Sequence, residues 1–376
     1  MLAPATILSA ADLRRALSVP DLTDPAGPPH AMRQLVDDAL AALVAAWGIR
    51  VLVDRQSPIV SIADNYDRLH YPPHGAARDA RYTRYVCESA LLRTQTSAMI
   101  PPLLRRLSAQ APPDILLACP GLVYRRDCID RLHSAEPHQL DLWRLTRTRE
   151  LGRDALHEMI EVTLGALLPG REHRLLPAEH PYTLGGLQID VRDDAGWVEI
   201  GECGLAKPQI LVENGHAPPA CGLAMGLGLD RVLMLRKGIE DIRLLRASDP
   251  RVSVQMQDLE PYRAVSAMPP VQRDLSLVVS GDATAEELGD TLRAELGERA
   301  SLIESVELRA ETAYADLPAA AVERLGIAAG QKNLLLRVVL RALDRSLTHA
   351  ECNGLRDEIY AVLHRGTRWH WAGRKQ

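Results

Sequence analysis

Polar side chains that could bind ions gather in residues 123–141, VYRRDCIDRLHSAEPHQLD. Arg125 follows an apolar run that predicts a strand, and a guanidinium held at the mouth of a sheet suits a phosphate or a carboxylate. Gln139 and Asp141 alternate with Leu140, so their side chains lie on the same face of a strand. An amide and a carboxylate side by side predict a receptor for an ammonium group. The alternative is a surface hairpin with solvated charges.

A glycine-rich turn is the second feature with chemical potential. Residues 226–231, GLGLDR, follow an apolar strand and open an apolar helix. The N-terminus of a helix favours an anion, and Arg231 adds a full positive charge there. The segment is not the dinucleotide-binding fingerprint, because Arg231 stands in place of its last glycine. The alternative is a pair of glycines that packs a helix, followed by a surface arginine.

Glu199, in the apolar strand pattern WVEIGECG, is the third feature. A carboxylate buried in such a strand is costly without a partner, and Mg²⁺ or an arginine would supply one. An ordinary salt bridge is the alternative.

The elements that carry these residues follow from hydrophobic periodicity. A turn-rich segment over residues 21–30 separates a short N-terminal helix from the rest. The remaining predicted elements are a helix at 32–47, a strand at 48–53, an antiparallel hairpin at 114–125 and 138–145, a helix at 150–168, strands at 187–191 and 197–204, and a strand, turn and helix over 222–235.

The order of elements changes after a boundary near residues 249–268. Capping boxes at Thr284 with Glu287 and at Thr348 with Glu351 each predict the start of a helix. Together with four apolar runs they give the order β-α-β-β-α-β, a ferredoxin-like module. Its predicted strands are 272–279, 303–310, 333–342 and 367–372, and its helices are 284–296 and 348–364.

The composition is typical of a cytoplasmic enzyme. The 376 residues are 47% hydrophobic and 25% charged, with neither a signal sequence nor an apolar run long enough to cross a membrane. The six cysteines form no C-x-x-C pair, which predicts reduced thiols rather than a zinc cluster. A net charge of −5 argues against general nucleic-acid binding but leaves room for a local basic track. The chain contains no phenylalanine.

Three features occur in the order found in motifs 2 and 3 of class II aminoacyl-tRNA synthetases, which they resemble. They are the hairpin strand that ends at Arg125, the strand with Glu199, and the G-x-G-x-x-R segment that starts a helix. The segments GLVYRRDCIDRLHSAEPHQ, LLRTQTS, HPYTLGGLQIDV and GLAMGLGLDRVLMLRKGIEDIRLL resemble the phenylalanyl-tRNA synthetase α subunit in particular. MPPVQRDLSLVV and DRSLT resemble its ferredoxin-fold anticodon-binding domain. The resemblance implies an α+β chain with an N-terminal extension (1–28), a class II antiparallel sheet flanked by helices (29–250), a linker (251–267) and a ferredoxin-like domain (268–376).

The resemblance also implies roles for individual residues. ATP and Mg²⁺ would be the cofactors of amino-acid activation, in which the carboxylate attacks the α-phosphate and positive charge stabilises the transition state. Arg125 and Arg231 would hold the phosphates and Glu199 the magnesium ion, with Pro137, Gly226 and Gly228 also at the ATP. The amino-acid site would comprise Ser97, Gln139, Asp141, His180, Tyr182, Thr183 and Ala224. The best phosphate contacts for a tRNA in the C-terminal module would be Arg337, Arg341, Arg345 and Arg368.

Several positions depart from the pattern of the family. Pro137 stands where a phenylalanine stacks on adenine, and Gln95 replaces a histidine. His180 and Tyr182 replace two apolar rings of the amino-acid pocket. Buried polar groups favour a ligand that pairs with them, so the preferred amino acid is phenylalanine or a more polar aromatic analogue. The alternative is that His180 and Tyr182 bond each other in an ordinary pocket.

Three functions follow from these features. The first is an ATP-dependent synthetase of the phenylalanyl type, a secondary paralogue, that transfers the activated amino acid to tRNA. The second is a ligase that passes it to another acceptor. The third is a non-catalytic relative that binds tRNA or an amino acid, for which Pro137 is the main indication. The helix at 32–47 occupies the place of the class II dimer motif, which leaves monomer and homodimer open.

Overall fold

The structure is a computed structural model that describes residues 7–108, 111–265 and 269–369. The chain forms two compact units. The first comprises Met1–Arg125, Glu136–Leu245 and Pro250–Arg263, and the second comprises Arg126–Ala135, Arg246–Asp249 and Ala264–Gln376. Residues 126–135, from the middle of the predicted hairpin, therefore pack with the C-terminal part of the chain.

A seven-stranded mixed sheet organises the first unit, with the strand order β1-β5-β6-β10-β9-β8-β7. Only β1 and β5 pair in parallel; the other neighbours are antiparallel. This architecture confirms the predicted α+β class. The strands are β1 (Arg50–Val53), β5 (Asp114–Leu122), β6 (His138–Thr146), β7 (His173–Pro177), β8 (Thr183–Asp193), β9 (Gly196–Ala206) and β10 (Cys221–Gly228).

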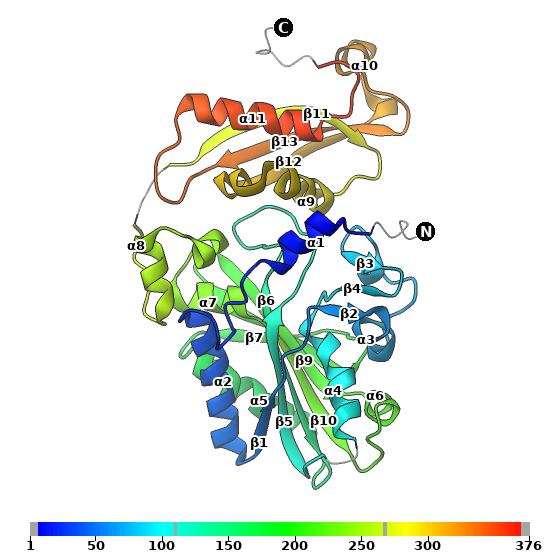
Figure 1. Cartoon of the computed structure of the whole chain (residues 1–376), viewed down its shortest axis with the longest axis vertical. Helices are drawn as coiled ribbons and strands as arrows, with labels where there is room; N and C mark the ends of the chain where they lie inside the picture. The colour runs from blue at the N-terminus through cyan, green and yellow to red at the C-terminus, as the bar shows by residue number, and fades with distance from the viewer. Residues whose placement is uncertain (1–6, 109–110, 266–268, 370–376) are drawn as a thin grey trace. The chain divides into compact units, whose positions relative to one another are not determined.

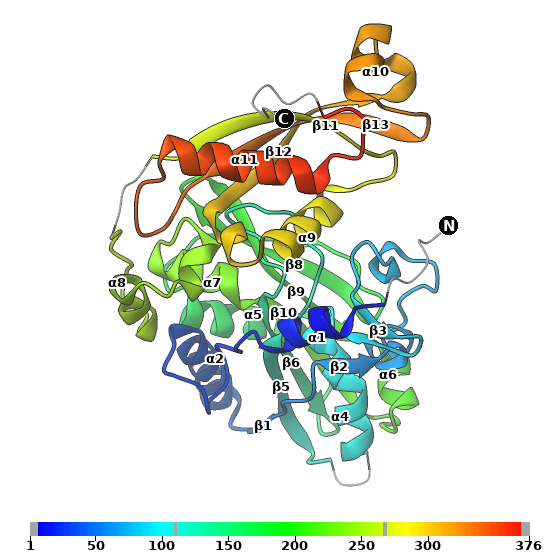
Figure 2. The same cartoon turned by 45° about the horizontal axis from the view of Figure 1, so that its top comes forward.

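Helices cover both faces of this sheet (Figure 1; Figure 2). On one side, α4 and α6 pack against Trp143 and Ala224 of the central strands. On the other side lie α2, α5 and α7. A small sheet of β2 (Ile59–Ser61), β4 (Ala90–Leu92) and β3 (Tyr85–Cys87) lies near α3 and α4 (Figure 1). The helices are α1 (Ala10–Leu17), α2 (Ala31–Trp47), α3 (Ile62–Asn65), α4 (Ile100–Leu107), α5 (Arg153–Leu167), α6 (Pro208–Glu213), α7 (Leu229–Lys237) and α8 (Pro250–Ser253).

Local sequence accounts for these elements. In α2 the His30 side chain accepts a hydrogen bond from the Met32 N–H, and Gly48 ends the helix in the left-handed conformation. The apolar stripe of α2, which includes Leu35 and Leu43, is fully buried. The β5–β6 hairpin forms in the predicted place, with Asp141 opposite Cys119.

The second unit has a three-stranded antiparallel sheet with the order β11-β13-β12. The predicted capping boxes at Thr284 and Thr348 are both present. The predicted last strand, 367–372, is not a strand over its described residues 367–369, and its remainder lies outside the described residues. The elements are β11 (Val271–Ser280), α9 (Ala285–Leu296), β12 (Ile303–Ala313), α10 (Ala319–Leu325), β13 (Gln331–Leu340) and α11 (His349–Leu363).

Two further properties bear on the sequence-based expectations. All six cysteines are free thiols. Across the described ranges, every helix is too short or too polar to cross a bilayer.

Candidate active site

The middle of the large sheet carries a row of polar residues on one face. Asp141 of β6 pairs with Gly226 of β10, and Gly226 pairs with Glu202 of β9. Residues paired across antiparallel strands project to the same face, so the two carboxylates flank Gly226. A Cβ atom built on Gly226 would meet only Asp141 Oδ2, at 3.8 Å. The glycine thus leaves open space on the sheet between two acidic side chains.

Asp141 is the most unusual ionisable group of this face. It is buried, and the Ser97 hydroxyl donates a hydrogen bond to its Oδ2. Its Oδ1 has no hydrogen-bond partner. Burial raises the pKa of Asp141 to about 6, although the Ser97 hydroxyl, the Trp143 indole and His180 oppose the rise. The indole N–H lies near this carboxylate without a well-aligned hydrogen bond.

The predicted amino-acid residues surround Asp141. The Thr96 N–H donates to Gln139 Oε1 over 3.1 Å, which ties β6 to the segment that carries Ser97. The Tyr182 ring stacks between Trp143 and His180, with centroid distances of 6.1 and 5.3 Å. The structure therefore brings together Ser97, Gln139, Asp141, His180, Tyr182, Thr183 and Ala224, the last opposite Trp143.

This group of residues contains an excess of unpaired polar atoms. Four buried side-chain atoms without a hydrogen-bond partner lie here: Thr96 Oγ1, Asp141 Oδ1, Trp143 Nε1 and Thr183 Oγ1. An unpaired buried polar atom costs about 1–3 kcal/mol, so such atoms are rare unless a ligand or water pairs with them. Their concentration around Asp141 makes this face the candidate binding site.

His180 is already paired in the free protein. Its Nε2 contacts the Glu202 carboxylate, and its ring stacks on Tyr182 at an interplanar angle of 23°. The direct bond between His180 and Tyr182, which was the alternative to a polar pocket, is replaced by ring stacking. Both His180 and Glu202 are partly buried, so this hydrogen-bonded pair forms one wall of the site.

The two arginines predicted at the phosphates act on the same carboxylate. Arg231, in the first turn of α7, donates to the backbone oxygen of Glu199 over 3.1 Å. The Arg125 guanidinium donates through Nε to the Thr94 carbonyl over 2.8 Å. Glu199 is exposed overall, yet the protein atoms around its carboxylate partly desolvate it. This desolvation and the neighbouring Glu202 and Asp190 raise its pKa, while both arginines oppose the rise. The two guanidinium groups therefore share one electrostatic environment with Glu199.

Glu199 differs from the sequence-based description in its burial. It was expected inside an apolar strand, but its side chain is exposed to solvent. The reason is a β-bulge between the pairs Ile189–Gly201 and Asp190–Glu199, which leaves Ile200 as an extra, buried residue. The bulge turns Glu199 to the same face as Glu202.

The other residues predicted at the ATP lie at the end of this face. Gly228 pairs with Gln139 and precedes α7 directly. Asp230 of α7 accepts a hydrogen bond from the backbone N–H of His138, next to Pro137. The Pro137 carbonyl accepts from the Val123 N–H over 2.9 Å, which places the proline beside the end of β5.

Sequence reasoning missed three residues of this site. Glu202 was overlooked because strict alternation puts it on the face opposite Glu199, and only the bulge reverses this. Trp143 follows Asp141 by two positions, so alternation could have found it. Tyr71 lies 70 residues before Asp141 with no local signal; its hydroxyl donates to Gln95 Oε1 over 2.7 Å, and its ring lies 6.3 Å from that of Tyr182.

The four arginines predicted to contact tRNA all have acidic partners in the second unit. Arg337 forms a two-pronged pair with Asp274 at 2.9 and 3.0 Å, and Arg345 lies 2.7 Å from Glu351. Arg341 pairs with Glu304, and Arg368 with Glu323. Their positive charge is thus compensated locally, which weakens their attraction for phosphate.

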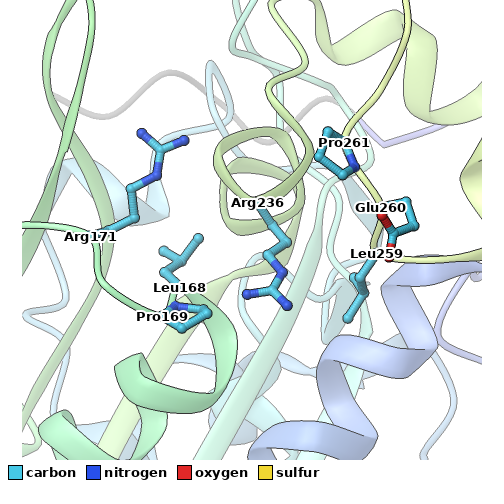
Figure 3. Close-up of a pocket in the computed structure, with 7 residues that line it drawn as sticks. All are labelled: Leu168, Pro169, Arg171, Arg236, Leu259, Glu260 and Pro261. Atoms are coloured by element: carbon cyan, nitrogen blue, oxygen red, sulfur yellow. The ribbon is translucent and has the colours of Figure 1, made fainter.

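A pocket of about 240 Å³ lies elsewhere in the first unit (Figure 3). It contains two arginines, and none of the predicted site residues line it. Arg171 donates to the Leu235 carbonyl over 2.9 Å and Arg236 to the Leu167 carbonyl over 3.5 Å, so the protein itself binds both guanidinium groups. The lining residues are Leu168, Pro169, Arg171, Arg236, Leu259, Glu260 and Pro261.

Comparison with known proteins places this geometry in a family. Residues 19–256, more than half of the chain, match the model of the tRNA synthetases class II core domain (F). The chain belongs to this class II synthetase family. It is 33% identical to the phenylalanine–tRNA ligase alpha subunit of Nostoc punctiforme. The 236 aligned residues cover 62% of this chain and 69% of that relative. It is 30% identical over 256 residues to that of Bacillus pumilus, covering 63% and 72%.

Among solved structures, the pyrrolysyl-tRNA synthetase of Desulfitobacterium hafniense matches with a TM-score of 0.46 at 18% identity, over 63% of this chain and 80% of that one. The family match confirms the predicted relationship of this class II synthetase to phenylalanine–tRNA ligase alpha subunits. Class II synthetases are ligases of protein biosynthesis that generally use ATP and Mg²⁺.

Proposed function

We propose that this class II synthetase activates an aromatic amino acid with ATP and transfers it to a tRNA, as a secondary paralogue of the phenylalanyl enzyme. The observation that carries the proposal is Asp141, a buried and half-paired carboxylate beside Ser97 on the open face at Gly226. Such a carboxylate gains a partner when the ammonium group of an amino acid binds. The unpaired Thr96 and Thr183 hydroxyls provide further polar contacts nearby.

The phosphates would bind at Arg125 and Arg231. The interaction of both guanidinium groups with Glu199 supports a shared anion site, with Gly226 and Gly228 leaving room along β10. The two positive charges would stabilise the charge that develops when the amino-acid carboxylate attacks the α-phosphate and pyrophosphate leaves. No side chain has to act as a nucleophile in this step.

A magnesium ion fits next to this anion site. Glu199, Glu202 and Asp190 raise one another's energy as like charges, which a divalent cation would relieve. When bound, Mg²⁺ neutralises phosphate charge. We assign Glu199 as the residue that holds it, because Glu202 is engaged by His180 and Asp190 by Arg174.

The side chain of the amino acid would meet Tyr182, Trp143, Ala224 and the His180–Glu202 pair. An aromatic ring with a hydrogen-bonding substituent suits this wall better than phenylalanine does, because the substituent can bond to the His180–Glu202 pair. His180→Phe leaves Glu202 without its partner but adds an apolar ring. We expect this variant to shift the ratio of kcat/KM towards phenylalanine; an unchanged ratio would contradict the polar-pocket hypothesis.

Amino-acid-dependent exchange of pyrophosphate into ATP tests the activation step. A panel of aromatic and polar amino acids should include at least one that supports exchange. Arg125→Ala should reduce exchange by about 10³-fold or more. Arg33→Ala, at a partly exposed arginine of α2, is the matched control and should leave exchange unchanged. Retained exchange in Arg125→Ala would place the phosphate site elsewhere.

Acylation assays then separate the acceptors. Transfer to tRNA supports the synthetase, whereas exchange without tRNA acylation favours a ligase with another acceptor. The pairing of Arg337, Arg341, Arg345 and Arg368 with carboxylates is the specific observation that favours this second candidate. Absence of exchange with every amino acid would favour a non-catalytic binding protein. We place the activity in the cytoplasm, in a monomer or homodimer.

A further inference from the structure

The loop of residues 126–135, between β5 and β6, is built into the second unit. Ile129 is buried in the hydrophobic core of that unit with Leu275 and Ile303. Its carbonyl accepts a hydrogen bond from the Val306 N–H over 2.9 Å. The Arg293 guanidinium donates to the carbonyls of Asp127 and Cys128, over 2.5 and 2.6 Å. The backbone of residues 127–129 is thus held in place.

The loop carries three side chains of types that can ligate metals. Asp127, Cys128 and His133 each offer one ligand atom, and these atoms lie within 4.8 Å of one another. Two ligands of one tetrahedral zinc ion are about 3.5 Å apart, given bond lengths of about 2.0–2.3 Å. Small side-chain rotations would therefore close the group around an ion. In the part of the chain that the structure describes, it is the one group of three or more such residues at this spacing.

Asp130 organises the same loop. Its Oδ1 accepts hydrogen bonds from the N–H groups of Leu132 and His133, over 2.7 and 2.9 Å. Its Oδ2 lies 2.7 Å from His133 Nδ1 and 3.4 Å from Cys128 Sγ. The Asp130 carboxylate thus fixes the orientation of the His133 ring, as a carboxylate beside a metal-ligating histidine does.

We propose that Asp127, Cys128 and His133 form a zinc-type metal site, with Asp130 as the residue that orients His133. Thiolate, imidazole and carboxylate together select a borderline-soft divalent cation over magnesium. Coordination replaces the thiol proton of Cys128, which passes to solvent. The site is independent of the proposed magnesium position at Glu199. By holding both ends of the loop together, the ion stiffens the connection between β5 and β6.

Cobalt titration of the full chain, after removal of metal by a chelator, tests the site. We expect one equivalent of Co²⁺ to bind with a thiolate-to-cobalt charge-transfer band, and Zn²⁺ to displace it. Cys128→Ser should abolish the band, and His133→Gln should weaken binding about tenfold or more. Asp130→Asn should weaken binding and retain the band.

Two control variants make the result specific. Cys87→Ser removes an exposed thiol outside the loop and should keep the band. Glu199→Gln should also keep it, which separates this site from the one in the proposed function. Circular dichroism in the presence of chelator checks that each variant folds. Absence of the band in the unaltered chain, or its persistence in Cys128→Ser, would overturn the proposal.

Discussion

At the scale of single residues, Asp141 links binding to stability. Folding raises the pKa of Asp141 from 3.8 to about 6. Its protonated form therefore favours the folded state at low pH, and this contribution to the free energy of unfolding is lost as the pH rises from about 4 to 6. At pH 7 its ionised form destabilises the free protein by on the order of 3 kcal/mol. In the proposed function, the ammonium group of the amino acid offsets this cost.

We predict that Asp141→Asn stabilises the free protein and removes activity. The amide can still accept the Ser97 hydrogen bond and carries no charge to bury. The free energy of unfolding should rise by about 1–3 kcal/mol at pH 7 and hardly at all near pH 4. Urea unfolding at both pH values measures this. Asp38→Asn, at an exposed position of α2, is the control. A loss of stability at pH 7 would contradict the prediction.

The same group predicts how amino-acid affinity depends on pH. An ammonium group binds ionised Asp141 better than the protonated form, so binding below pH 6 must release a proton. We expect the dissociation constant of the amino acid to rise up to tenfold for each pH unit below about 6. Calorimetric titrations in buffers of different ionisation enthalpy measure both the affinity and the proton count. An affinity that stays constant from pH 7 to pH 5 would exclude Asp141 as the ammonium receptor.

At the scale of elements, the glycines of β9 and β10 have different roles. Gly201 is needed for close packing of the backbone, whereas Gly226 leaves room for the proposed substrate. A Cβ atom at Gly201 would come within 2.2 Å of the Gly226 carbonyl, whereas one at Gly226 has open space above it. Gly226→Val should therefore fold with nearly unchanged stability and lose pyrophosphate exchange by more than tenfold. Gly201→Ala should lower the melting temperature instead. Full exchange activity in Gly226→Val would show that no substrate crosses this part of β10.

The elements also show how far the sequence predicts the site. Alternation along β6 correctly grouped Gln139 with Asp141, because regular pairing keeps the period of two. The same rule failed on β9, where the extra residue at the bulge brings Glu202 beside Glu199. Tyr71 reaches the site only through tertiary packing, which no local pattern reports. Regular strands can be read from the sequence, while irregular and long-range features cannot.

At the scale of the whole molecule, the loop of residues 126–135 belongs to a different unit from the strands that it joins. The sequence predicted it as part of a continuous catalytic core, since polar loop residues carry no sign of their partners. Ile129 anchors the loop in the hydrophobic core of the second unit, where it is buried with residues more than 140 positions away. Arg125 and Glu136, which flank the loop, belong to the first unit.

This connection predicts that Arg293 influences ATP binding without touching the site. Arg293→Ala removes two charge-assisted hydrogen bonds to the loop carbonyls, so the loop loses part of its fixed conformation and Arg125, which immediately precedes it, is held less firmly. We expect KM for ATP in pyrophosphate exchange to rise on the order of tenfold, while KM for the amino acid changes little. Arg299→Ala, which breaks an exposed ion pair with Glu358 in the same unit, is the matched control and should leave both constants unchanged. Equal ATP constants for the two variants would show that the loop is a passive connection.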